Sequence, residues 1–365
     1  SYPLIDGKVV GCPHHILENS RTNLIPYSED FSNPNWTKTN SNITSNSVIS
    51  PDGSLNADKI TDDSTNGAHR MTEAFTTSST GSFTYSIFLK KGTLTTAQFQ
   101  VFNSGTASSA NVDLVNGTIT SDGTGVDHKI ENYGNDWFKC SISGTLSNIT
   151  TTVYLYIKQK PAYIGDGDYL YAWGAQLEEG SYPTSYIPTN GAAVTRSAET
   201  ANGAGDASTF NDSEGVLMAE ISGLTEVGTN QSIAISDGSI SNRILFRYNS
   251  TNQIRVIVIS GSVFVFDKLL NISSIEEYNK FVIKYKQNDF ALWVNGFELG
   301  TDNSGVTPTG LSELALDDGS GINDFYGNTK QIQYYNSALT DSELEQLTSW
   351  ISFTDMANGQ LYTIE

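Results

Sequence analysis

The strongest indication of the fold is the stretch Tyr169-Leu-Tyr-Ala-Trp-Gly-Ala-Gln-Leu-Glu-Glu-Gly-Ser-Tyr-Pro-Thr-Ser-Tyr-Ile-Pro-Thr189. Its first half alternates aromatic residues with smaller ones, which is the period of two that is typical of a β-strand. The chain then turns at Gly180 and reaches Pro183 and Pro188, which fix their own φ and favour extended backbone before them. The stretch is predicted to be the last strand of one β-domain and a rigid lead-out to the next.

Composition supports a β-fold throughout. The chain has 365 residues, enough for two domains with separate cores. Only 16% of the residues are charged, while 11% are aromatic. Together with abundant Ser, Thr, Asn and Gly, this composition favours twisted sheets joined by polar turns over helical bundles.

The charge balance excludes one class of partner. Forty acidic and twenty basic residues give a formal charge of −20, which repels phosphate backbones, so no nucleic-acid partner is expected. The same charge disfavours direct binding of anionic polysaccharide unless a divalent cation bridges the two, and it leaves neutral glycans open. The two cysteines, Cys12 and Cys140, are expected to be reduced thiols. Membrane insertion is not expected, and no signal peptide is recognised at the N-terminus.

Short alternating runs separated by turn residues follow one another along the chain, as in β-sandwiches. In the second half, Asn295-Gly296 between two apolar runs predicts a hairpin. One helix is predicted over residues 340–350, with Thr340 and Glu343 forming a capping box and Leu344 on its apolar side. The predicted fold is all-β, with two tandem antiparallel β-sandwiches and one short C-terminal helix.

Five segments follow from these patterns. We expect an N-terminal strap that pairs with a neighbouring domain or ends one upstream (1–20), a jelly-roll sandwich (21–187), a linker with almost no large apolar residue (188–213), a second sandwich (214–352) and a C-terminal tail (353–365).

The first half resembles a module common in bacteriophage tail-fibre and head-spike proteins, and is similar to carbohydrate-binding, galactose-binding-like jelly rolls. The residues that carry this resemblance are Arg21-Thr-Asn-Leu-Ile-Pro-Tyr-Ser-Glu-Asp-Phe31, Trp36, Pro51-Asp-Gly53, Ala57-Asp-Lys-Ile60, Phe88-Leu-Lys-Lys91, Trp137 and the segment from Trp173 to Thr189, preceded by Gly11-Cys-Pro13 and Leu17-Glu18. The second half resembles laminin-G-like, concanavalin-type sandwiches, through Leu292-Trp-Val-Asn-Gly296 and the segment from Gly327 to Leu344.

These resemblances imply an appendage of a virion, either a tail fibre or a head spike, that touches cell-surface glycan. They also imply contacts with other virion proteins and a homo-oligomer, with a trimer as the expected state. Such a protein would be made in the host cytoplasm and located in the virion. Because both sandwich types serve many functions, the resemblance by itself leaves the function open.

Two aromatic residues are candidates for stacking on sugar rings. Trp36 lies in the polar stretch Asn33-Pro-Asn-Trp-Thr37 and is expected to be exposed. Tyr163 is expected at a loop tip, where function concentrates. The other tryptophans in apolar patterns, Trp173, Trp293 and Trp350, are interpreted as core residues.

The loop Asp317-Asp-Gly-Ser-Gly-Ile-Asn-Asp324 is a candidate calcium site. Its oxygen ligands would be Asp317, Asp318, Asn323 and Asp324, because calcium prefers several hard oxygens and short Asp/Asn/Gly loops supply them. A plain solvated turn is the alternative. No other cofactor is expected.

Recognition of glycan without catalysis is the favoured function. A structural spacer or decoration of the virion is one alternative, and a polysaccharide lyase or hydrolase is another. Catalysis would need an aligned Tyr, His and Arg set or two placed carboxylates. Glu178 and Glu179 are adjacent acids, but at the end of a strand they are expected to face solvent.

Overall fold

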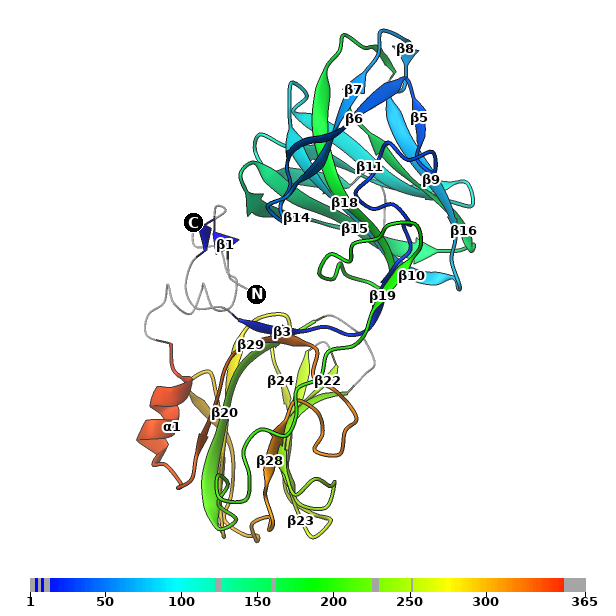
Figure 1. Ribbon diagram of the computed structural model, residues 1–365. Helices are drawn as coiled ribbons and strands as arrows, with labels where there is room; N and C mark the ends of the chain where they lie inside the picture. The colour runs from blue at the N-terminus through cyan, green and yellow to red at the C-terminus, as the bar shows by residue number, and fades with distance from the viewer. Residues whose placement is uncertain are drawn as a thin grey trace. The chain divides into compact units, whose positions relative to one another are not determined.

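The computed structural model describes residues 4–5, 8–9, 14–121, 126–158, 162–224, 230–250 and 252–350. These residues fall into two compact units, one formed by residues 4–5, 8–9 and 20–197 and the other by residues 14–19 with 198–350. We call them the N-terminal and the C-terminal sandwich. Both are antiparallel β-sandwiches, and the single helix among the described residues is short, so the predicted fold class is confirmed (Figure 1).

The N-terminal sandwich consists of two six-stranded sheets, which we call sheet I and sheet II. Sheet I has the order β14-β15-β10-β18-β7-β6. Its strands are β6 (Ser41–Ile49), β7 (Leu55–Asp62), β10 (Gly81–Lys91), β14 (Asp127–Gly134), β15 (Trp137–Leu146) and β18 (Tyr169–Glu179). Sheet II has the order β13-β12-β11-β16-β9-β5. Its strands are β5 (Thr37–Thr39), β9 (Arg70–Thr76), β11 (Thr96–Asn103), β12 (Thr106–Asp113), β13 (Thr118–Ser121) and β16 (Thr150–Tyr156).

Short strand pairs complete this part of the chain. They are β1 (Leu4–Ile5) with β2 (Lys8–Val9), β8 (Asn66–Gly67) with β17 (Tyr163–Ile164), and β4 (Arg21–Asn23) with β19 (Val194–Arg196).

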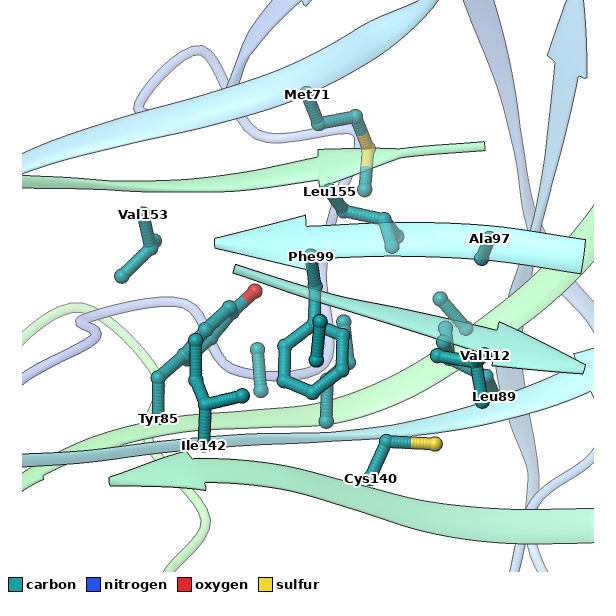
Figure 2. Close-up of a cluster of buried hydrophobic side chains, with 14 of the residues drawn as sticks. Met71, Tyr85, Leu89, Ala97, Phe99, Val112, Cys140, Ile142, Val153 and Leu155 are labelled. Carbon is teal, nitrogen blue, oxygen red and sulfur yellow. The ribbon is translucent and has the colours of Figure 1, made fainter. Parts of the chain in front are cut away.

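The core of the N-terminal sandwich lies between sheets I and II. Figure 2 shows alternate residues of facing strands meeting there, among them Tyr85 and Leu89 from one sheet and Phe99 and Leu155 from the other. All four are fully buried. Cys140 is also buried in this core, and burial raises the pKa of its thiol, as expected of an unreactive cysteine. Cys12 lies outside the described residues.

The decisive stretch forms β18, which lies in the middle of sheet I, paired with β10 and β7. Alternate residues lie on opposite faces, as predicted, and the smaller residues Leu170 and Ala172 are the ones that face the core. The pairing register shifts at the position of Gly174, which has a φ of +61°. Because this β-bulge changes the face presented by later residues, Ala175 and Leu177 also face the core.

The C-terminal sandwich pairs a six-stranded sheet, in the order β27-β26-β25-β20-β29-β3, with a five-stranded one, in the order β24-β23-β22-β21-β28. The six strands are β3 (His15–Leu17), β20 (Glu214–Gly223), β25 (Asn279–Lys286), β26 (Phe290–Val294), β27 (Phe297–Asp302) and β29 (Gly327–Tyr335). The five strands are β21 (Gln231–Ser236), β22 (Arg243–Ser250), β23 (Gln253–Ser260), β24 (Val263–Asn271) and β28 (Glu313–Ala315).

Two predicted local signals appear in this sandwich. Asn295 and Gly296 connect β26 to β27 with φ values of 50° and 90°, as a two-residue hairpin turn requires. Helix α1 (Asp341–Thr348) follows Thr340, whose backbone N–H donates to the Glu343 carboxylate at 2.8 Å. The buried Leu344 packs this helix on the outer face of its sheet, against Met218 and other apolar residues (Figure 1).

The strap and the linker are both incorporated into the sandwiches. Within residues 1–20, strand β3 pairs with β29, and Leu17 is buried in the core of the C-terminal sandwich. Residues 188–213 differ from the expected free linker. Strand β19 belongs to the N-terminal sandwich, whereas Phe210 is buried against Tyr334 in the C-terminal one. Backbone pairing, which polar residues also provide, explains why composition did not reveal this. The tail over 353–365 lies outside the described residues.

Among the described residues, the structure contains no helix with the length and apolar character needed to cross a membrane.

Candidate functional site

The outer face of sheet II carries the most distinctive set of polar and aromatic side chains in the N-terminal sandwich. Because successive residues of a strand point to opposite faces, the core positions Phe99 and Val101 place Gln98, Gln100 and Phe102 on the outer face. The same alternation around Val153 and Leu155 of β16 places Tyr154 and Tyr156 there. We call this set, together with Arg70, Thr72 and Asn111 of the neighbouring strands, the polar-aromatic face.

Three aromatic rings follow one another on the polar-aromatic face. The rings of Tyr154 and Tyr156 are stacked, with centroids 5.8 Å apart and planes at 6°. Phe102 contacts Tyr154 edge-on, with centroids 6.4 Å apart. Phe102 is 38% exposed and Tyr154 is half-buried. Aromatic surface is therefore presented along the direction of the strands.

Amide side chains lie beside these rings. Strand pairing puts Gln98 opposite Tyr156 and Gln100 opposite Tyr154. On the other side of Gln98 lies Asn111, whose Oδ1 accepts a hydrogen bond from Gln98 Nε2 at 3.0 Å. Gln98 and Gln100 are only 4% and 3% exposed, so these amides mainly line the base of the face.

The outer face of sheet I, in contrast, is covered by its own chain. Phe88, Trp137 and Trp173 form a buried cluster there, and Tyr186 covers it with its ring centroid 4.5 Å from that of Trp173. Trp173 is therefore buried, as expected, but under the segment that follows β18 rather than between the sheets. The expected lead-out to the second domain folds back instead, with Ile187 N–H donating to Gln176 Oε1 at 2.7 Å.

Glu178 corrects one expectation. Its side chain is fully buried and does not face solvent. Its carboxylate accepts hydrogen bonds from the Thr184 N–H at 3.0 Å, from the Thr184 hydroxyl at 2.7 Å and from Gln176 Nε2 at 2.8 Å. Arg21 Nε lies 3.8 Å away. Because the bulge in β18 turns Glu178 under the returning segment, this acid holds the segment in place. Glu179, half-buried, accepts hydrogen bonds from Ser78 and Ser79.

An acidic cavity of about 420 Å³ lies elsewhere in the N-terminal sandwich. Its lining residues are Glu29, Asp30, Ser32, Ser45, Asn46, Asn56, Asp58, Thr189 and Asn190. Asp58 is buried and accepts hydrogen bonds from the backbone N–H groups of Phe31 and Asn46, both at 3.0 Å. Burial nevertheless raises the pKa of Asp58 to about 6. Its carboxylate ties the turn at Phe31 to the irregular part of β6 at Asn46, which accounts for its position without a ligand.

Trp36 is not exposed, contrary to expectation. Only 1% of its surface is accessible, and its ring lies 5.1 Å from that of Phe31 within the main core. Its indole N–H donates to the Tyr27 carbonyl at 2.9 Å. The polar residues before it form a turn, closed by a hydrogen bond from Trp36 N–H to the Asn33 carbonyl, that directs the indole inward. A buried side chain cannot stack on a sugar.

Tyr163 lies in the short strand β17 and is half-buried. Its hydroxyl donates to Asp62 Oδ2 at 2.9 Å, and its ring lies 4.4 Å from that of His69. Asp62 also accepts three backbone N–H groups from residues 166–168. Tyr163 thus helps to fix this loop, and a role in carbohydrate binding stays a prediction. Of the other tryptophans, Trp293 is buried as expected, whereas Trp350 is half-buried beneath Lys280.

The side chains expected to bind calcium, Asp317, Asp318, Asn323 and Asp324, are engaged by other groups of the chain, and calcium binding stays a prediction. Asp318 Oδ2 lies 3.2 Å from Arg243 Nη1 and 3.6 Å from Arg247 Nη2, so two guanidinium groups already neutralise this carboxylate. The remaining three side chains are used locally. Asp317 accepts from the Gly319 N–H, Asn323 donates to Asp318, and Asp324 accepts from the Tyr326 hydroxyl. In the described parts of the chain, no cluster of three or more His, Cys, Asp or Glu side chains could hold a metal ion.

The residues of the polar-aromatic face were not selected from the sequence. The signal was present, because both Gln98-Phe-Gln-Val-Phe102 and Thr152-Val-Tyr-Leu-Tyr156 alternate core residues with amides or tyrosines. What the sequence lacked was the pairing that puts β11 beside β16 and so joins the two sets.

Comparisons with known proteins identify similar folds at low identity. No protein-family model matches the chain, and no curated protein matches it. Among solved structures, it is similar to the CBM40 module of the Ruminococcus gnavus IT-sialidase, with 16% identity, a TM-score of 0.34, and coverage of 40% of this chain and 94% of that one. The NanB sialidase of Streptococcus pneumoniae is similar with 14% identity, a TM-score of 0.33, and coverage of 38% of this chain and 25% of that one. Sheep galectin-11 is similar with 7% identity, a TM-score of 0.25, and coverage of 33% of this chain and 89% of that one.

The chain thus spans about a quarter of the length of the NanB sialidase that it matches. The similar proteins include a carbohydrate-binding module and lectin-like sandwiches. The sandwich architecture of this chain follows from its own sheet order and strand register.

Proposed function

We propose that the polar-aromatic face binds glycan and that the chain does so without making or breaking bonds in its ligand. The observation that carries this proposal is the aromatic surface that the half-buried Tyr154 and the 38% exposed Phe102 present on the outer face of sheet II, beside the largely buried amides of Gln98 and Gln100. Flat aromatic surfaces can take up the C–H faces of sugar rings, and amides can hydrogen-bond to sugar hydroxyls. The binding named in the R. gnavus CBM40 complex, with α2,3-sialyllactose, agrees with a glycan ligand in general.

The side chains of the face also support recognition rather than catalysis. A lyase or hydrolase would place ionisable groups in pairs around one bond. Among the described residues that strand alternation puts on this face, the one carboxylate is Asp113, at the end of β12. It accepts hydrogen bonds from the backbone of Val115 and Asn116 and from the Asn116 amide, so it serves its own turn.

The placement of this chain in a virion tail fibre or head spike is part of the same proposal. It is supported by the sequence resemblance to phage fibre and spike modules described above. In a trimer, or in several fibres on one particle, weak sites would act together, because the second contact is made at a high effective concentration. Location in the virion and contacts with other virion proteins belong to this proposal.

Glycan-array screening of the full chain, followed by calorimetric titration with the oligosaccharide selected, tests the binding. We expect Tyr154→Ala to weaken binding by about tenfold, equivalent to about 1.4 kcal/mol, because it removes the centre of the aromatic surface. The matched control is Tyr133→Ala, a tyrosine that is 39% exposed and lies on the other sheet. It should leave the affinity unchanged.

Three results would contradict the proposal in different ways. Equal losses in Tyr154→Ala and Tyr133→Ala would place the site elsewhere. A full chain that binds no glycan on the array would favour a structural spacer or decoration of the virion. New reducing ends or unsaturated sugars after incubation with the bound polysaccharide would identify a depolymerase.

A further inference from the structure

Arg70 is the cationic residue at the edge of the polar-aromatic face. It begins β9 and pairs directly with Tyr156 of β16. Its guanidinium carbon lies 5.3 Å from the ring centroid of Tyr154 and 5.6 Å from that of Tyr156. Its Nη1 also donates to the Tyr156 hydroxyl at 3.1 Å. The cation is therefore held against Tyr154, which the proposed glycan would contact, and against the buried Tyr156.

Arg70 differs from most other arginines of the chain in having no acidic partner among the described residues. Four of the six arginines lie within 4 Å of a carboxylate: Arg21, Arg243, Arg247 and Arg255. Arg70 has no such ion pair in the part of the chain that the structure describes, and its buried Nε has no hydrogen-bond partner there. The buried Nε is not accessible to a ligand, whereas the two N–H donors of Nη2 have no hydrogen-bond partner among the described residues.

The acidic groups of sheet II do not neutralise Arg70. Glu73, three residues later in β9, alternates to the inner side of the sheet, and its burial raises its pKa to about 7. Asp113 lies on β12, which is separated from β9 by β16 and β11. The formal charge of −20 is spread over the whole chain, and charges farther away than about 8 Å are largely screened at physiological ionic strength. Arg70 is the cation that lies over the rings of this face among the described residues.

We propose that the glycan bound at the polar-aromatic face is acidic and that Arg70 binds its carboxylate. This inference rests on the proposed function and adds the class of ligand. A planar guanidinium matches a carboxylate through two parallel hydrogen bonds, which a neutral sugar cannot reproduce. The neutral part of the sugar ring would contact Tyr154 and Phe102. Local charge thus reverses the expectation, drawn from net charge, that an acidic polysaccharide needs a bridging divalent cation.

The test compares two ligands that differ in one group. The full chain is titrated with a galacturonic acid oligosaccharide and with the same oligosaccharide after reduction of its carboxyl groups to primary alcohols, in the presence of a chelator. We expect the acidic ligand to bind at least about tenfold more tightly, and its affinity alone to fall as salt is raised. Arg70→Met, which keeps the aliphatic contact with the rings, should abolish the difference between the ligands. Arg70→Lys should restore only part of it.

The control variant is Lys129→Met, which removes an exposed cation from β14 of the other sheet. It should leave the ratio of the two affinities unchanged. If both ligands bind wild type with equal affinity, and Tyr154→Ala lowers that affinity, the acidic specificity is overturned. The proposal that this face binds glycan is then retained. If neither ligand binds, the proposal of a carboxylate ligand for Arg70 fails, and the glycan array alone decides whether the face binds another glycan. The wild-type ratio and its salt dependence decide the matter even if Arg70→Met does not fold.

Discussion

Replacement of Asp318 by Asn should destabilise the C-terminal sandwich strongly. The Asp318 side chain is 4% exposed, and those of Arg243 and Arg247 are 9% and 13% exposed. Removing one partner of a buried ion pair typically costs about 3–5 kcal/mol, since the other charge stays buried and unneutralised. Asparagine keeps the side-chain oxygen that accepts the hydrogen bond from Ser320. We therefore expect a loss of stability at the lower end of this range, about 3 kcal/mol. For a unit of this size, that loss lowers Tm by roughly 6–12 °C.

The matched control is Asp267→Asn on the same sheet. Arg255 and Asp267 form a two-point ion pair, with Nε–Oδ1 and Nη2–Oδ2 distances of 2.8 and 2.5 Å, but their side chains are 33% and 35% exposed. Exposed pairs contribute about 0–1 kcal/mol. Calorimetry of the full chain, with the transitions of the two sandwiches resolved, measures both variants. Equal Tm losses in the two variants would refute the reasoning from burial.

The same experiment separates an arginine-neutralised carboxylate from a calcium ligand. Burial raises the pKa of Asp318, but hydrogen bonds from Ser320 and Asn323 and the charge of Arg243 together hold this pKa below its usual value. The stabilisation is present above the unfolded pKa of about 4 and is lost as the pH falls further, so wild type and Asp318→Asn should converge in acid. A chelator should leave the wild-type Tm unchanged. A fall in Tm with chelator, reversed by calcium, would restore the metal hypothesis.

Two further substitutions test buried carboxylates of the N-terminal sandwich. Burial raises the pKa of Glu73 from 4.5 to about 7, so the folded state keeps a proton that the unfolded state releases, and stability falls as the pH rises through this window. Glu73→Gln should remove this pH dependence and raise the free energy of unfolding by about 3 kcal/mol over wild type above pH 7. Urea unfolding at a series of pH values measures it. Parallel curves of stability against pH for the two proteins would disprove the prediction. Glu178→Gln should cost about 1–3 kcal/mol and speed amide exchange at Thr184 and Ile187, because the segment over 181–190 loses its charged acceptor. The control is Glu179→Gln, at a half-buried position, which should change the free energy of unfolding by no more than about 1 kcal/mol. If Glu178→Gln is equally mild, the segment is held by other contacts.

The fold was predictable because alternation records which face of a strand is buried. The strands around Phe99, Leu155 and Leu217 could be found from sequence without knowing their partners. The hairpin at Asn295-Gly296 and the helix after Thr340 depend on short-range backbone chemistry, which the sequence also contains.

The exposure of single residues was less predictable because it depends on what later segments cover. Trp36 has polar neighbours, yet a turn directs it into the core. Glu178 ends a strand, yet the chain returns over it. In the same way, the acidic loop around Asp318 could suggest a metal only while the arginines of β22, far away in sequence, were out of view.

Burial of polar residues in strands has two different causes in the N-terminal sandwich. On sheet I the returning segment covers Gln176 and Glu178 and satisfies them, so their burial is explained within the chain. On sheet II, Gln98 and Gln100 are 4% and 3% exposed, and Gln98 is satisfied by its hydrogen bond to Asn111. Arg70, in contrast, is held on two tyrosines with no carboxylate partner among the described residues. Ordering such side chains costs conformational entropy, and placing a cation there without an acid adds to that cost. A ligand that supplies a negative charge would offset this cost, in agreement with the acidic glycan that we propose for this face.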